Sequence, residues 1–204
     1  MPRLRSLPLE EFDPELRAML GADLKSEREL RPMSVRAHHP ELAKAYARFA
    51  GAIKQHAVLP ERLRELVRLR IAFHNQCRSC MAMRYADAVD DGVSEVLVCS
   101  LEKPQEAPDL SAAERVALRF ADLLATNHLA IGDALYAELA EHFSEKAIVE
   151  LGSWCAVCVG FGRLAATWNM VEDLPERFRA EGEAPVTPWG ADAWVTQAAS
   201  KRAA

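Results

Sequence analysis

Hydrophobic residues recur along most of this 204-residue chain at the three-to-four-residue spacing of amphipathic helices, whereas the alternation typical of strands is almost absent. The pattern predicts helices over residues 15–24, 40–56, 61–73, 78–89, 94–101, 111–127, 133–143 and 144–168. Local signals support several of these boundaries, such as the capping box that begins at Ser111 and the helix-ending pair Asp91-Gly92. We therefore expect a compact, all-α, multi-helix fold.

The same pattern assigns a buried and an exposed side to individual helices. In the helix over 40–56, a single face carries Leu42, Ala45, Tyr46, Phe49 and Ile53, and we expect it to pack on the core. In the next helix the aliphatic residues supply the buried side, and four arginines are expected to face solvent: Arg62, Arg64, Arg68 and Arg70. Asn75-Gln76 should interrupt that helix.

Length and linker composition predict one domain with a tail. A chain of this size can bury a sizeable core, and the proline-containing stretch 102–109 is too short to separate two domains. We expect a single helical domain over 1–178. Residues 179–204 are rich in Ala, Gly, Pro and charge and should form a loosely held tail, although Trp189 and Trp194 suggest that it docks on this subunit or on a neighbour.

Charge and hydropathy exclude some partners. The net charge is −5, and basic residues are interleaved with acidic ones, which argues against nucleic acid. The longest apolar stretches, around 148–159, are shorter than the roughly 20 residues of a membrane span and contain glycine, so we expect no membrane segment. The charged N-terminal residues do not fit a signal peptide, so we expect a cytoplasmic protein.

Cys77-Arg78-Ser79-Cys80 is the strongest chemical signal in the chain. Two cysteines three apart at a helix start can share one face, so an oxidised sulfur can be closed into a disulfide by the other. Inert thiols and metal binding are the alternatives. Five cysteines, an odd number, read as free or catalytic thiols. Cys155 and Cys158 lie too far along the chain to complete a zinc ribbon and are expected to be core thiols, as is Cys99, so we expect no metal.

Several segments share a recognisable arrangement. Glu65-Leu66-Val67 is followed after nine residues by Cys77-x-x-Cys80, and the next helix ends at Asp91-Gly92-Val93-Ser94. Further matching segments are 39–42, 111–115, 120–121, 142–144, 148–151 and 161–164. Together they resemble the carboxymuconolactone decarboxylase family and, within it, the alkylhydroperoxidase D-like, peroxidase-related branch, over roughly residues 39–168.

The resemblance implies a fold, an assembly and an activity. Members of this branch are all-helical, assemble into trimers or hexamers and reduce hydroperoxides with electrons from a dithiol reductant or a reductase protein, with no cofactor. By position, Cys80 resembles the peroxidatic thiol, Cys77 the resolving thiol, and Glu65 the start of a proton relay. The decarboxylase branch lacks the CxxC pair, so that reaction fits this chain less well.

This chain departs from the branch at Arg84, which stands where redox members carry a histidine. On a regular helix Arg84 would share a face with both sulfurs and could stabilise a thiolate, but a guanidinium cannot donate a proton near neutral pH. His74, Tyr85 or a water held by Glu65 could donate instead. His74 could equally cap its helix, and Glu65 could serve only as an ion-pair partner of Arg68 or Arg84.

Three functions remain open on this basis. The first is a thiol-dependent peroxidase that cycles through a Cys80 sulfenic acid and a Cys77–Cys80 disulfide. The second is a thiol–disulfide oxidoreductase or redox sensor that uses the same pair without peroxide. The third is a non-catalytic helical oligomeric relative.

Overall fold

The computed structural model describes residues 2–179 and 194–195, and these residues are almost entirely helical. The α-helices and strands in chain order are α1 (Pro14–Leu20), α2 (Glu27–Arg36), α3 (Pro40–Gln55), α4 (Glu61–His74), α5 (Arg78–Ala82), β1 (Met83–Arg84), α6 (Ala86–Asp90), α7 (Glu95–Ser100), α8 (Ala112–Thr126), α9 (Asp133–Ala140), α10 (Glu145–Trp168), α11 (Glu176–Arg179) and β2 (Trp194–Val195). Three 3₁₀ turns accompany them: Leu9–Glu11, Ala22–Leu24 and His128–Ala130. The predicted all-α fold class is confirmed.

Several helix boundaries are set by local capping. The N-cap serines of four helices each accept a hydrogen bond from the backbone N–H three residues further on: Ser26, Ser94, Ser111 and Ser144. α1 ends at Gly21 and α10 at Asn169, both in the left-handed conformation that terminates helices, with φ of 54°. These signals are local in the sequence, so the predicted starts of α7, α8 and α10 are confirmed.

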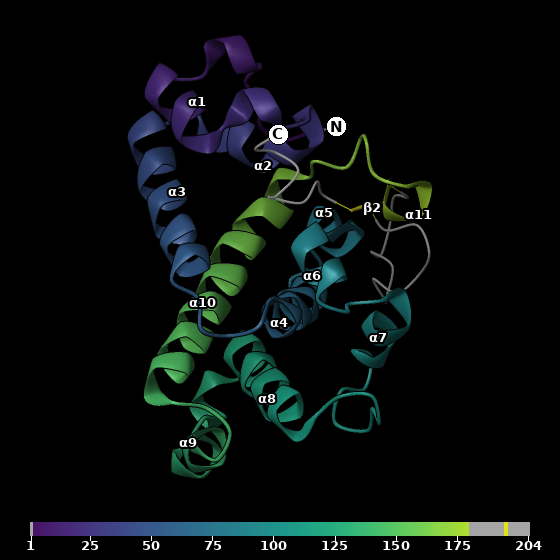
Figure 1. The fold of residues 1–204 in the computed structure, drawn as a ribbon. Helices are drawn as coiled ribbons and strands as arrows, with labels where there is room; N and C mark the ends of the chain where they lie inside the picture. Colours follow the sequence, from purple (N-terminus) through teal and green to yellow (C-terminus); the bar gives the residue numbers. More distant parts are fainter. Residues whose placement is uncertain (1, 180–193, 196–204) are drawn as a thin grey trace.

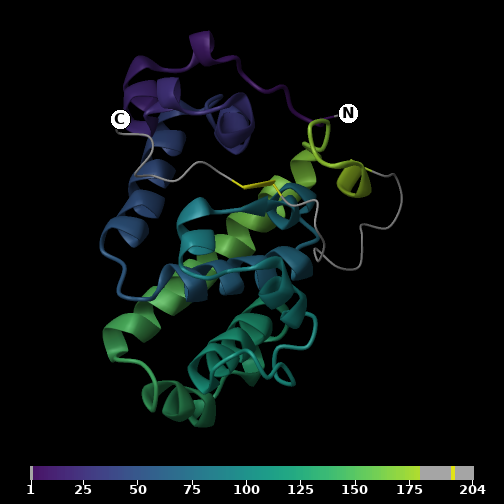
Figure 2. The ribbon, with the colours of Figure 1, turned by 45° about the vertical axis from the view of Figure 1, so that its right-hand side comes forward.

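α10 is the central element of the molecule. Figure 1 shows it running from the end formed by α1, α2 and α3 to the opposite end formed by α9, and the turned view in Figure 2 keeps it in that position. It packs against α4 and α8, which also pack on each other, and the largest hydrophobic cluster fills the space between these three helices. The end with α1, α2 and α3 has a smaller cluster of its own.

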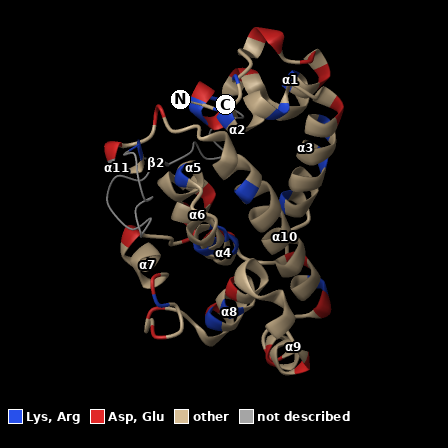
Figure 3. Ribbon diagram, turned by 180° about the vertical axis from the view of Figure 1, so that it is seen from behind, with Lys and Arg blue, Asp and Glu red and all other residues tan. Residues whose placement is uncertain are grey.

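α10 is also, among the described residues, the one helix that is long and apolar enough to cross a membrane by length and composition. Figure 3 shows its middle section almost free of charge, and the sequence carries no charged residue between Glu150 and Arg163. The helix contacts α3, α4, α5, α8 and α9, but only 22% of its apolar segment is buried, so it joins the bundle through one side and leaves apolar side chains such as Val149 and Leu164 exposed on another.

The expectation that the arginines of α4 face solvent is wrong. Arg64 and Arg68 are each only 6% exposed, because α4 lies between α8 and α10 and has no free side. Buried arginines need compensating partners, and each arginine of α4 has a carboxylate. The pairs are Arg62–Glu114, Arg64–Glu61, Arg68–Glu65 and Arg70–Asp122.

The single helix expected over 78–89 is also wrong, because the chain leaves the helical conformation at Met83. In a continuous helix the Met81 carbonyl would accept from the Tyr85 amide. Here the Tyr85 amide donates to Glu65 at 3.1 Å, and the Met81 carbonyl accepts from the Arg84 guanidinium at 2.8 Å. Side chains have replaced the backbone partners, so α5 stops and a two-residue strand follows.

That strand, β1, receives part of the C-terminal tail. β2 pairs with it in parallel, with Met83 opposite Trp194 and Arg84 opposite Val195. The expectation that a tryptophan-bearing tail docks is confirmed for Trp194 on this subunit, directly after the CxxC segment. Trp189 and most of the proposed tail lie outside the described residues, and the division into 1–178 and 179–204 stays a prediction.

The N-terminal third differs from the sequence-based expectation in two places. α2 was not predicted. It contains Pro32, which is unfavourable inside a helix, but its capping box and the buried Leu30 and Val35 outweigh that cost. In α3 the expected core face is partly exposed, with Leu42 at 64% and Phe49 at 51%.

Candidate functional site

Cys77 and Cys80 form a disulfide at the start of the short helix α5. α4 ends at His74, and the expected break at Asn75-Gln76 is present; Gln76 has a φ of 49°, which turns the chain toward α5. Cys77 is fully buried, whereas Cys80 is partly exposed. The two sulfurs are therefore joined, but they differ in access to solvent.

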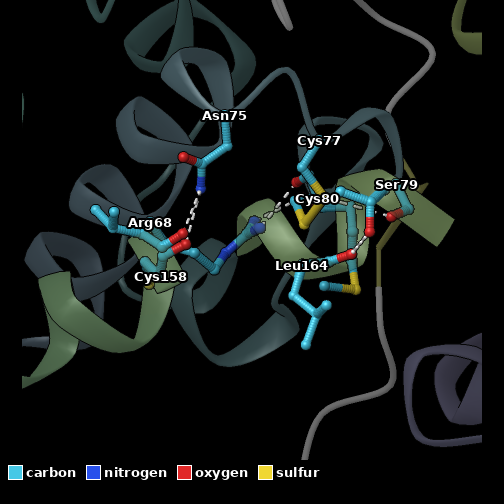
Figure 4. The surroundings of a disulfide bond; sticks show 10 residues. Arg68, Asn75, Cys77, Ser79, Cys80, Cys158 and Leu164 are labelled. Carbon is cyan, nitrogen blue, oxygen red and sulfur yellow. Dashed lines mark hydrogen bonds between the residues drawn. A yellow bond between two sulfur atoms is a disulfide. The ribbon is translucent and has the colours of Figure 1, made fainter. Parts of the chain in front are cut away.

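The turn that carries the cysteines is fastened to α10. Asn75 donates from Nδ2 to the Cys158 carbonyl at 2.8 Å and accepts at Oδ1 from Arg163 at 3.1 Å, an arrangement visible in part in Figure 4. A Cβ on Gly162 would lie only 2.6 Å from Asn75 Nδ2, so this close approach requires glycine. The geometry of the cysteine turn is thus set by α10, more than 80 residues away in the chain.

Glu65 and Arg68 form a buried ion pair behind the cysteines. Arg68 donates from Nε and Nη2 to the two carboxylate oxygens of Glu65, both at 2.7 Å. Its remaining donors reach the carbonyls of Cys80 and Met83, each at 2.8 Å, as Figure 4 shows for Cys80. Burial opposes the charge on Arg68, but Glu65 outweighs it, and the pKa of the guanidinium is raised. The pair therefore fixes the position of the backbone where α5 ends.

A cavity of about 550 Å³ opens beside this pair. Its wall includes Glu65, Arg68, Cys80, Tyr85 and Cys158, so the candidate nucleophile and the candidate relay carboxylate face one space. Apolar residues from α2, α3 and α10 complete the wall. The volume is within the range of pockets that hold small organic ligands.

Tyr85 presents a phenol to this cavity. The Arg68 guanidinium lies over its ring at 4.8 Å from the centroid, and burial raises the pKa of the hydroxyl to about 12. The group is therefore neutral at physiological pH and carries a proton that it can donate. Tyr46 of α3 lines the same cavity, and burial raises its pKa as well.

Arg84 lies outside this cavity wall, which corrects the expected alignment with the sulfurs. That alignment required a regular helix through Arg84, and α5 ends at Ala82. Arg84 is 1% exposed and donates to both carboxylate oxygens of Glu95, at 2.8 and 3.1 Å. The possible pair between Glu65 and Arg84 is likewise replaced, because Glu65 binds Arg68.

His74, a candidate proton donor, is directed elsewhere. Its Nε2 lies 2.7 Å from Oδ1 of Asp122 on α8, and it is not part of the cavity wall. Burial acts to raise the pKa of Asp122, but hydrogen bonds from His74 and Arg70 outweigh it and lower that pKa. His74 therefore has a structural partner that joins α4 to α8.

The other cysteines differ from one another. Cys155 is a buried core thiol, as expected. Cys158 lines the cavity, and burial raises the pKa of its thiol to about 12, so it is protonated near neutral pH. Cys99 is exposed, so the expectation that it is a core residue is wrong. Among the described residues, no group of three or more His, Cys, Asp or Glu side chains is placed to hold a metal ion.

Sequence reasoning named Arg68 only as a possible ion-pair partner of Glu65 and missed its bond to the Cys80 carbonyl, and it missed the place of Tyr46 in the cavity wall. Arg68 follows Glu65 by three residues, the spacing of an ion pair on one helix face, and that spacing was the available signal. Nothing in the local sequence indicated that α3 would bring Tyr46 to the cavity wall, because its position depends on how α3 packs against α10.

Comparison with known proteins gives a match to one family over part of the chain. Residues 40–123 match the carboxymuconolactone decarboxylase family. An uncharacterized protein of Mycobacterium tuberculosis is 35% identical over 117 residues, which cover 56% of this chain and 40% of that protein's own length. The uncharacterized protein YnjA of Escherichia coli K12 is 28% identical over 113 residues, covering 55% of this chain and 60% of that protein.

A solved structure with a similar fold covers more of the chain. It is an uncharacterized peroxidase-related protein from Ralstonia eutropha JMP134, described as an alkylhydroperoxidase AhpD core. The TM-score is 0.62 at 19% sequence identity, and the alignment covers 87% of this chain and 94% of that one. At this identity the likeness establishes the fold alone.

Proposed function

Residues 40–123 match the carboxymuconolactone decarboxylase family and the fold is AhpD-like, and from that premise we propose that this chain is a thiol-dependent peroxidase. The observation that carries the proposal is the position of Cys80. It is disulfide-linked to the buried Cys77 and at the same time lines a cavity large enough for an organic hydroperoxide. Family peroxidases use a CxxC pair, whereas the decarboxylase reaction gives no role to one.

The proposed reaction begins at Cys80. Its thiolate attacks the O–O bond, a sulfur–oxygen bond forms, and the alkoxide that leaves takes up a proton to become an alcohol. The Cys77 thiolate then attacks the Cys80 sulfenic acid, forming the S–S bond and releasing the oxygen as water once it is protonated. A dithiol reductant or reductase protein returns both cysteines to the reduced form.

Access and charge support this order of attack. Cys80 opens on the cavity, and Cys77 is buried beside it, so peroxide meets Cys80 first. α5 has only five residues, so its dipole is a weak source of thiolate stabilisation. The Arg68 guanidinium donates to the Cys80 carbonyl, but its charge is shared with the Glu65 carboxylate, so it offers the Cys80 thiolate only part of a positive charge.

Tyr85 is the proposed source of the proton for the leaving alkoxide. It lines the cavity with Cys80, and its hydroxyl is neutral because burial raises its pKa. Neither Arg84 nor His74 lines the cavity, and each is held by a carboxylate, Glu95 and Asp122 respectively. Glu65 acts in this scheme as a positioning residue, since its oxygens hold Arg68 and the Tyr85 amide.

A redox couple that is regenerated by dithiols fits a reducing compartment, and the cytoplasm remains the proposed location. The relatives found by sequence extend well beyond the matched region, and they are uncharacterized proteins. Substrate, reductant and location are therefore proposed from the site.

The decisive experiment is peroxide consumption by the purified protein with a small dithiol as reductant. The wild type should turn over an organic hydroperoxide repeatedly, Cys77→Ser should react once and stop, and Cys80→Ser should be inactive. If the wild type leaves peroxide untouched but reduces a disulfide substrate through Cys77 and Cys80, the protein is an oxidoreductase of the second kind. If neither reaction occurs, it is a non-catalytic relative.

A further inference from the structure

Arg36 on the cavity wall is a cation without a carboxylate partner among the described residues. Arg36, at the end of α2, lies over three aromatic rings, with its guanidinium carbon 4.5 Å from the Tyr46 centroid, 4.8 Å from Trp168 and 5.7 Å from Phe161. It donates from Nη1 to the Pro32 carbonyl at 2.8 Å. Its buried Nε has no hydrogen-bond partner, and within the described part of the chain the only ionisable groups that act on its charge are the phenols of Tyr46 and Tyr85, with no carboxylate among them.

The other arginines on the cavity wall that form ion pairs make the contrast clear. Arg31 pairs with Glu172 and Asp173, Arg64 with Glu61, and Arg68 with Glu65. Burying a cation without a counter-ion is costly, and the aromatic rings around Arg36 offset only part of that cost. An anionic group of a ligand in the cavity would supply the missing counter-ion of Arg36.

The charges along the rest of the wall are largely balanced. Seven cationic and four acidic side chains line it among the described residues, and two of the cations, Lys54 and Arg31, also pair with carboxylates just outside the lining, Asp87 and Glu172. The case for an anionic ligand therefore rests on Arg36.

Packed side chains connect Arg36 to the cysteines. Trp168, under its guanidinium, belongs to one hydrophobic cluster with Val35, Cys77 and Cys80. Further apolar side chains line the cavity around it: Leu30, Met33, Val157, Phe161 and Met170. A molecule that places an anionic group on Arg36 would lay an apolar body along this wall toward Cys80.

We propose that Arg36 binds the carboxylate of the substrate, so that the hydroperoxide reduced at Cys80 belongs to an apolar organic acid of the fatty-acid type. This inference rests on the proposed peroxidase function. A planar guanidinium with free donors suits a carboxylate, because it can bind both oxygens at once. The aromatic rings hold the guanidinium in place before the ligand arrives.

The kinetic test compares linoleic acid hydroperoxide with its methyl ester, which has the same apolar body and no charge. The wild type should show a KM at least about tenfold lower for the acid, as expected for a charge-assisted contact in a buried site. Arg36→Met should remove this preference by raising the KM for the acid while leaving that for the ester unchanged. Arg36→Lys, which keeps the charge, should restore part of the preference.

Arg48→Met is the matched control, because Arg48 is an exposed arginine on α3 that does not line the cavity. It should keep the full preference for the acid. An unchanged KM for the ester in Arg36→Met shows that the cavity is intact. Should that variant fail to fold, the wild-type ratio of acid to ester decides alone, and equal KM values overturn the inference.

A second readout separates this inference from the peroxidase proposal. Binding of the unreactive hydroxy acid and of its methyl ester can be measured by tryptophan fluorescence, with no turnover. If the wild type binds the acid more tightly than the ester and Arg36→Met loses this difference, the result supports carboxylate binding by Arg36 even if no peroxide is consumed. If peroxide is reduced but the acid and the ester bind equally, the peroxidase proposal stands and carboxylate binding by Arg36 is refuted. An effect of Arg36→Met on the KM of the dithiol alone would also overturn it.

Discussion

At the scale of single residues, the unequal burial of Cys77 and Cys80 predicts their order of reaction. Cys80 lines the cavity and Cys77 is fully buried, so peroxide should reach Cys80 first. Treatment with one equivalent of peroxide should leave a sulfenic acid on Cys80 in Cys77→Ser, detectable by dimedone labelling and mass spectrometry. Cys80→Ser should give no labelled Cys77. Labelling of Cys77 in that variant would reverse the two roles.

Tyr85 allows a second prediction at this scale. If its phenol protonates the leaving alkoxide, Tyr85→Phe should slow peroxide reduction roughly 100-fold, the lower end of general acid contributions. Because its pKa is raised to about 12, the wild-type rate should show no loss from Tyr85 ionisation up to about pH 10. Tyr136→Phe is the control, since Tyr136 lies half-exposed on α9 and outside the cavity wall. Equal rates for Tyr85→Phe and the wild type would remove Tyr85 from the mechanism.

Arg84 gives the third prediction. It is buried and binds Glu95, so Arg84→Met should lower the free energy of unfolding by about 1–3 kcal/mol, measured by urea denaturation. Lys103→Met, which removes an exposed lysine, should have almost no effect. The pH dependence of Cys80 alkylation should stay the same in Arg84→Met. A raised thiolate pKa in that variant would return Arg84 to the site.

These residues also show what the sequence can disclose about the site. Glu65, Cys77 and Cys80 were predicted as a group, and the structure brings Glu65 and Cys80 to one cavity, because their spacing along the chain carries the signal. Arg84 was placed by assuming a regular helix. Its real partner, Glu95, lies on the following helix α7, and no local pattern discloses which carboxylate a buried arginine selects.

At the scale of elements, the Glu65–Arg68 pair determines where α5 ends. Arg68→Met should destabilise the protein by about 3–5 kcal/mol, because it leaves the Glu65 carboxylate buried without a partner and frees two carbonyls. The double variant Glu65→Gln/Arg68→Met should lose less than Arg68→Met alone, since no unpaired charge remains. Urea denaturation of the three proteins measures both values. A double variant less stable than Arg68→Met would contradict this account.

The same pair explains why some elements could be predicted from the sequence and others could not. α7, α8 and α10 begin at serines whose capping bonds span three residues, so the local sequence determines their starts. The end of α5 depends on Glu65 and Arg68, which lie on α4 and bond across 12 to 20 residues. Apolar spacing across 78–89 is compatible with one helix, and only these tertiary bonds select the break.

At the scale of the whole molecule, the tail and the core meet at the redox segment. β2 pairs with β1 directly after α5, while α10 holds the preceding turn through Asn75. The cysteine turn is thus fixed from both ends by segments distant in the sequence. Such contacts between remote segments follow from packing, which explains why the all-α class could be predicted while the surroundings of the cysteines could not.

The exposed face of α3 leads to the prediction of a homo-oligomer. Leu42, Ala45, Phe49 and Ala52 are exposed and follow the spacing of a coiled-coil seam. An apolar stripe of this kind is unusual on a free surface, and a second copy of α3 presents the matching pattern. We expect a trimer or a multiple of it, as the family resemblance implies, with α3 in the interface.

Light scattering at micromolar concentration should therefore give a mass well above the 22.6 kDa of one chain. Leu42→Lys/Phe49→Lys should shift the protein toward monomers, because two lysines per subunit would place like charges in the interface. Val149→Lys changes an equally exposed apolar residue on α10, outside the α3 stripe, and should keep the wild-type mass. A wild-type particle of one chain would rule out the oligomer. A double variant that stays oligomeric would instead place the interface on another face.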